Sequence, residues 1–150
     1  MKHSHVIITA NLGSLRAYRI TETSLVHRRP GELIRKIEYE AAHRKLSDVV
    51  TDRQGRFAGS GVAGTPSRAS GEHHHLLEEM KKKAVKQIAH DIDGIIKHSD
   101  AEKYHLALPK LISKDVVSQL SKSSQNKITK TIAADIVKEP VGELRERFKV

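Results

Sequence analysis

The chain has 150 residues, a length that fits one domain built around a single core. Its 27 lysines and arginines exceed its 18 aspartates and glutamates and give a net charge of +9, which makes a polyanion a reasonable partner. The sequence has no cysteine, which excludes disulfides, zinc–thiolate sites and thiol nucleophiles.

The content of aromatic and apolar residues excludes further classes of protein. With three tyrosines, two phenylalanines and no tryptophan, the chain has too few rings for a protein that stacks successive bases of a single strand. The early apolar run at residues 6–10 is far shorter than a signal-peptide core or a membrane span. We therefore expect a cytoplasmic protein that is neither secreted nor inserted in a membrane.

The N-terminal part of the chain has the patterns of three strands. His5–Ala10 is a nearly continuous apolar run, as expected of a central strand buried on both faces. The turn-forming residues Asn11–Ser14 then lead into a second strand at Leu15–Thr21, which would pair with the first as an antiparallel hairpin. Period-two alternation at Ile37–Ala41 predicts a third strand near a sheet edge.

A long amphipathic helix is predicted from about Leu77. Its apolar residues recur at intervals of three and four and are Leu77, Met80, Ala84, Ile88, Ile92 and Ile95. Glu78 and Glu79 suit the first turn of such a helix, and Lys97 and His98 suit its last turn.

The remaining elements complete an α/β fold. Tyr104–Leu108 predicts a fourth strand, which the long helix would place beside the first strand and parallel to it. A short helix at Ser113–Leu120, a fifth strand at Ile128–Val137 and a terminal helix at Val141–Phe148 follow. The expected architecture is a mixed five-stranded sheet in the order 3-2-1-4-5 with flanking helices, similar to that of ribonuclease H.

Residues 52–72, between the third strand and the long helix, have a different composition. They contain five of the nine glycines and three arginines, with no acidic residue between Asp52 and Glu72. This composition predicts a flexible loop at about residues 52–75 within the single domain. Such a loop is either a disordered connection without function or a binding element, and both interpretations remain open. The uniform positive charge favours phosphate as a target of a binding element.

The lysines of the long helix extend this basic segment. They lie on the face opposite the apolar stripe, which is usually just a solvated face but here is continuous with the arginines of the loop. The candidate nucleic-acid-binding residues are Arg53, Gln54, Gly55, Arg56 and Arg68 of the loop and Lys81, Lys82, Lys83 and Lys86 of the helix.

Two short sequence patterns resemble known binding sites but lack the flanking structure or spacing that these sites require. Gly59–Gly64 reads G-x-G-x-x-G, but no strand directly precedes it and Thr65 and Pro66 follow in place of a helix start, so we assign no dinucleotide site. In the run His73–His75, neighbouring side chains would point about 100° apart on a helix, and we assign no metal site.

Two enzyme classes also lack their signatures. A two-metal nuclease needs carboxylates on its central strands, and residues 6–11 and 104–108 contain none. Ser60 is not part of a G-x-S-x-G elbow, as a serine hydrolase of that type requires. We assign no catalytic residue and no cofactor.

Three stretches of the chain match a known family. They are Val6–Asn11 with Arg16–Arg19, Leu46–Asp48 through Asp52–Phe57, and Ala134–Pro140 with Glu143 and Leu144. On these residues the chain resembles the bacterial host attachment protein family, which groups with bacterial relatives of the middle domain of archaeal and eukaryotic peptide chain release factors. The resemblance covers most of the chain.

The resemblance implies a five-stranded sheet flanked by helices. It also implies a loop after the third strand at the place where release factors carry the Gly-Gly-Gln that enters the peptidyl-transferase centre of the ribosome. This chain has no Gly-Gly-Gln, and Gln54 stands between Arg53 and Gly55, so no residue inherits peptidyl-tRNA hydrolysis. The acid that the family usually has after the first strand is replaced by Asn11.

Three functions remain open. The first is an RNA- or ribosome-associated module that presents Arg53, Arg56 and Arg68 to phosphates. The second is a noncatalytic protein-interaction, stress or host-attachment-related module with a protein partner, although a role in host attachment would need export and the chain shows no export signal. The third is a hydrolase of unknown substrate. We infer neither DNA specificity nor a membrane partner.

Overall fold

The computed structural model describes residues 5–20, 31–39 and 67–150, with side chains described from residue 75 onward in the last range. One mixed sheet contains all five strands of this part of the chain, in the order β3-β2-β1-β4-β5. The strands are β1 (His5–Ala10), β2 (Ser14–Ile20), β3 (Glu32–Glu38), β4 (Tyr104–Leu108) and β5 (Ile128–Ala133). The predicted α/β architecture and strand order are confirmed.

The sheet is antiparallel on one side of β1 and parallel on the other. β1 pairs antiparallel with β2, and β2 pairs antiparallel with β3. β1 pairs parallel with β4, and β4 pairs parallel with β5. Because β1 is central, its side chains are buried on both faces, which explains its nearly unbroken apolar run.

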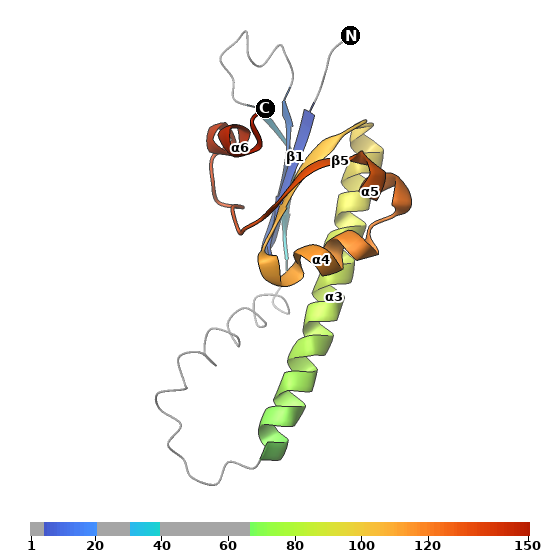
Figure 1. Cartoon of the computed structure of the whole chain (residues 1–150), viewed down its shortest axis with the longest axis vertical. Helices are drawn as coiled ribbons and strands as arrows, with labels where there is room; N and C mark the ends of the chain where they lie inside the picture. Colours follow the sequence, from blue (N-terminus) through green and yellow to red (C-terminus); the bar gives the residue numbers. More distant parts are fainter. Residues whose placement is uncertain (1–4, 21–30, 40–66) are drawn as a thin grey trace.

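Helices cover the two faces of the sheet unequally (Figure 1). On one face lie α3 (Ser67–Ser99), α4 (Lys110–Gln119) and α5 (Lys122–Lys127). Ile88 and Ile92 of α3 are fully buried there against β1 and β4 residues such as Ile8 and Leu106, as the apolar stripe predicts. On the opposite face α6 (Val141–Phe148) buries Leu144 and Phe148.

α3 begins at Ser67, about ten residues before the predicted start. Residues 67–76 contain one glycine and no proline, so they are compatible with a helix despite the glycine-rich sequence before them. Glu78 and Glu79 therefore lie well inside the helix and not in its first turn, whereas Lys97 and His98 do occupy the last turn. Figure 1 shows the N-terminal turns of α3 extending beyond the sheet.

Two strands differ from their predicted limits. β3 begins at Glu32, before the predicted start at Ile37, and ends at Glu38, whereas residues 40 and 41 of the predicted strand lie outside the described residues. An irregularity in the β2–β3 register between Ala17 and Tyr18 interrupts the period-two pattern in the first half of β3. β5 ends at Ala133 and not at Val137, because the chain turns there and brings Asp135 to the end of β1.

Two helices also differ from the prediction. α4 begins at Lys110, directly after Pro109, because proline is well tolerated just at the start of a helix. α5 was not predicted. It is a single short segment whose first turn is capped by the Ser121 hydroxyl, which accepts a hydrogen bond from the backbone N–H of Ser124 at 3.2 Å.

Candidate functional site

The lysines of the predicted nucleic-acid site lie on α3, near its crossing with α4. Lys82, Lys83 and Lys86 are exposed. Within the described residues these three lysines form no ion pair, whereas the Nζ of Lys81 lies 3.4 Å from the Oδ2 of Asp115 on α4. Lys81 therefore joins the two helices, and the other three lysines are available to an external anion.

A groove of about 340 Å³ runs between α3 and α4 beside these lysines. Its lining residues are Glu78, Lys81, Lys82, Val85 and Lys86 from α3 and Asp115, Ser118 and Gln119 from α4. The groove thus combines three lysines and two acidic residues with a small apolar wall and two uncharged hydrogen-bonding side chains.

The arginine part of the predicted site has no described geometry. Arg53, Gln54, Gly55 and Arg56 lie outside the described residues, as does the predicted loop as far as residue 66. Arg68 belongs to the first turn of α3, and its side chain is not described. The structure therefore places the four lysines relative to one another but does not place the arginines.

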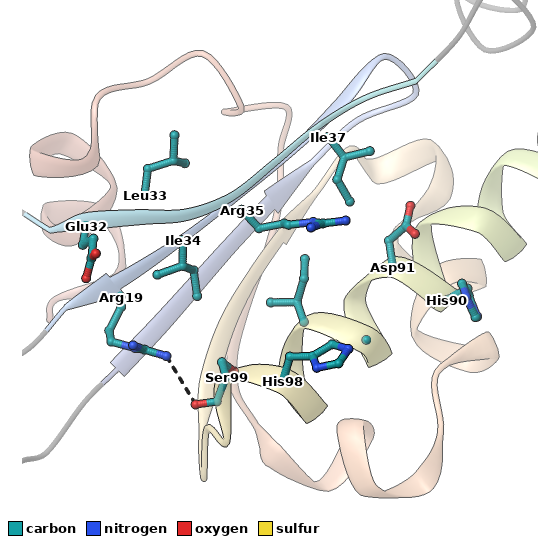
Figure 2. A pocket seen from close by; sticks show the side chains of 12 residues that line it. Arg19, Glu32, Leu33, Ile34, Arg35, Ile37, His90, Asp91, His98 and Ser99 are labelled. Carbon is teal, nitrogen blue, oxygen red and sulfur yellow. Dashed lines mark hydrogen bonds between the residues drawn. The ribbon is translucent and has the colours of Figure 1, made fainter.

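A second pocket, of about 580 Å³, lies between the β2–β3 edge of the sheet and the C-terminal half of α3 (Figure 2). Arg19 and Arg35 reach it from the strands, and Asp91 and His98 reach it from the helix. Its apolar surface comes from Ile34, Ile37 and Ile95.

Sequence reasoning missed this second pocket, because its residues come together only through the pairing of β2 with β3 and the packing of α3 on the sheet. Two signals were present in the sequence. Arg19 stands in the largely apolar strand β2, and Gly94 stands inside a strong helical pattern, where glycine is unfavourable.

Asp91 is held in place at the edge of this pocket. The hydroxyl of Tyr39 donates a hydrogen bond to its Oδ2 at 2.9 Å, and the Nε2 of Gln87 donates to its Oδ1 at 3.1 Å. Burial, and then the charge of Asp91 and its hydrogen bond, raise the pKa of Tyr39 far above its usual range. Tyr39 is therefore a permanent donor that orients the carboxylate.

The polar residues at the carboxyl end of β1 form a structural tie. The Oδ1 of Asn11 accepts hydrogen bonds from the backbone N–H groups of Gly13 and Ser14, each at 2.8 Å, and so fixes the hairpin turn. Its Nδ2 donates to the two carboxylate oxygens of Asp135 at 3.1 and 3.2 Å. Both ends of the Asn11 amide are thus used within the protein.

The histidines do not form a metal centre in the part of the chain that the structure describes. His75 lies on α3 with its Nε2 3.3 Å from the Oε1 of Glu79, and the side chains of His73 and His74 are not described. Across the described side chains, no group of three or more metal-ligating residues comes together.

A further property of the described helices is their hydropathy. None of them combines the length and the hydropathy that crossing a lipid bilayer requires.

Comparison with known proteins identifies the family. No curated protein matches the chain. One family, described as protein required for attachment to host cells, matches residues 6–148, which is nearly the whole length. The chain therefore belongs to the family of proteins required for attachment to host cells.

Proposed function

We propose that this protein binds RNA through its phosphate backbone. The observation that supports the proposal is the group of three exposed lysines, Lys82, Lys83 and Lys86, on one side of α3. Within the described residues they lack ion-pair partners, so an external polyanion would not have to displace an internal carboxylate from them. Phosphate binding releases condensed counterions, and this release is the main source of sequence-independent affinity for nucleic acids.

The basic loop would add to this contact surface. Arg53, Arg56 and Arg68 are close in sequence to the start of α3, and Gln54 and Gly55 separate the first two of them. The resemblance to the middle domain of release factors supports a ribosomal or structured RNA as the partner. The chain lacks Gly-Gly-Gln, so the proposal is one of binding without hydrolysis.

The salt dependence of binding tests this proposal. With about four to six phosphate contacts, the log–log slope of affinity against salt should be roughly −3 to −4. Replacing Lys82, Lys83 and Lys86 together with Gln should flatten the slope by about two units. Fluorescence anisotropy with a labelled ribosomal RNA fragment, measured across a salt series, gives both slopes.

A matched control separates local contact from net charge. Lys103, Lys122 and Lys138 are exposed and lie outside α3, and their joint replacement with Gln removes the same charge. This control should keep at least most of the wild-type slope. Equal slopes for the two triple variants, or no RNA binding by the wild type at low salt, would contradict the proposal.

A protein-interaction module is the second candidate, and the groove between α3 and α4 favours it. Val85 gives this groove an apolar wall, and Lys82 and Lys86 stand at its rim, which suits an extended acidic peptide. The family description, which concerns attachment to host cells, fits a binding role of this kind. In this case a Ser118→Arg variant, with its exposed position in the groove, would lose the protein partner while staying folded, and the salt series with RNA would show no binding.

A further inference from the structure

The pocket between β3 and the C-terminal half of α3 has the size of a small-molecule site. Its volume of about 580 Å³ falls within the range of pockets that enclose most of a small organic ligand. It lies on the flank of α3 that faces β3, whereas the groove with Lys82 and Lys86 lies on the flank that faces α4. The two sites are therefore separate.

The strand side of the pocket presents guanidinium groups. Arg35 of β3 is exposed, and among the described residues it has neither a hydrogen bond nor an ion pair. Figure 2 shows its side chain extending across the pocket toward α3. Arg19 of β2 donates from its Nη2 to the backbone carbonyl of Ser99 at 3.4 Å, which offsets the negative C-terminal end of α3 next to His98.

Neither acidic residue of the pocket forms an ion pair with Arg35 in the described part of the structure. Both carboxylate oxygens of Asp91 already accept hydrogen bonds, from Tyr39 and from Gln87. Glu32 lies at the far end of the pocket, away from the guanidinium of Arg35 (Figure 2). The guanidinium of Arg35 is therefore left without an ion-pair partner among the described residues, and a ligand anion can contact it.

Gly94 provides room beside these cations. A Cβ placed on Gly94 would meet no atom within 4 Å, so packing does not require a glycine at this position. Glycine is nevertheless one of the least favourable residues inside a helix. Its effect here is a flat, open stretch of helix next to Ile95 in the wall of the pocket.

We propose that this pocket binds a phosphomonoester of a small organic molecule, with a nucleoside monophosphate as its representative. Arg35, Arg19 and His98 would contact the phosphate, because guanidinium groups match phosphate oxygens in geometry and charge. Ile34, Ile37 and Ile95 would contact the organic body, which lies against the open backbone at Gly94. Free phosphate would leave this apolar surface empty.

Titration calorimetry of the full-length protein with adenosine monophosphate tests the proposal, with adenosine and inorganic phosphate as its two halves. Saturable binding of the monophosphate is expected, with each half weaker by roughly tenfold or more, because adenosine loses one or two charge-assisted contacts and inorganic phosphate loses the apolar contacts. Arg35→Gln should weaken binding by a similar factor. Lys36→Gln removes the same charge from the next residue of β3, on the other face of the sheet, and should leave affinity unchanged.

Gly94 supplies a second test that is independent of charge and of folding. Gly94→Phe should fill the pocket and abolish binding, and its melting temperature shows whether the variant is folded; the Cβ itself enters open space. Gly94→Ala should melt higher and still bind. The Lys82, Lys83 and Lys86 triple variant should bind the nucleotide normally, whatever its affinity for RNA. Absence of saturable binding by the wild type, or wild-type affinity in both Arg35→Gln and Gly94→Phe, would overturn the assignment of this pocket.

Discussion

The side-chain amide of Asn11 lies 3.1 and 3.2 Å from the two carboxylate oxygens of Asp135, a residue 124 positions later in the chain. This contact joins the turn after β1 to the segment after β5, so it connects segments near the beginning and the end of the sequence at the carboxyl ends of these two strands. An aspartate at position 11 would face a second carboxylate there.

We therefore expect Asn11→Asp to destabilise the protein by about 1 kcal/mol at neutral pH, through the lost hydrogen bond and the repulsion of two exposed carboxylates. The double variant Asn11→Asp with Asp135→Asn restores a donor opposite an acceptor and should recover most of this loss. Urea unfolding of the wild type, the single variant and the double variant measures the coupling. A double variant no more stable than Asn11→Asp would show that the contact contributes nothing.

The buried face of α3 gives the largest expected effect on stability. Ile88 is fully buried between α3 and the sheet, so Ile88→Asp should cost on the order of 3–5 kcal/mol by placing an unpaired charge in the core. Leu76→Asp is the matched control on the same helix, since Leu76 is 53% exposed, and it should cost about 1 kcal/mol or less. An unchanged melting temperature for Ile88→Asp would refute this account of the helix face.

His105 should make stability depend on pH on the acidic side of neutrality. It is buried on β4, its ring is stacked on His5 at 5.9 Å, and it contacts Phe148 at 5.2 Å between centroids. Burial, then the nearby charges of His5 and Lys130, lower the pKa of His105 below its ordinary value of about 6.5. The buried Nδ1 has no hydrogen-bond partner in the described structure.

The sign of the effect follows from the direction of this shift. The unfolded chain binds a proton at His105 more readily than the folded protein does, so the contribution to stability is complete above about pH 6.5 and is lost as the pH falls toward the lowered pKa of the folded state. Replacing His105 with Phe should flatten the decline of the unfolding free energy between neutral and mildly acidic pH. The exposed His90 is the control, and a His90→Gln variant should keep the wild-type decline.

The arginines of the basic segment can be tested apart from the lysines. Replacing Arg53, Arg56 and Arg68 together with Ser should flatten the salt slope of RNA binding by about two units, because each lost phosphate contact removes about 0.7 from the slope for a single strand. The same variant should melt close to the wild-type temperature if its charges are exposed. Coincident binding curves for the variant and the wild type across the salt series would exclude these arginines from the interface.

The sequence predicts an element best where its burial follows a simple pattern, either continuous or periodic. β1 and β4 are apolar on both faces, and the stripe through Ile88 and Ile92 identifies the inner face of α3, so the strand order and the main helix could be predicted. The limits of β3 could not be, because a register irregularity in the pairing of β2 with β3 is a property of two strands and not of one.

The candidate sites were predictable to different degrees. The lysines of α3 are neighbours in sequence, so their common surface follows from helical spacing alone. The partner of Lys81 is on α4, and only the packing of the two helices brings Asp115 to it. Arg19, Arg35 and His98 come from three elements, and no local pattern in the chain indicates that they share a pocket.

The central place of β1 constrains the order in which this protein can fold during synthesis. β1 and β2 are made early and can pair at once, but the other edge of β1 pairs with β4, about 100 residues later in the chain. Until β4 and α3 have left the ribosome, the hairpin therefore has an open strand edge and an apolar face exposed to the cell. The nascent chain, more than the finished protein, is the form that needs protection from aggregation.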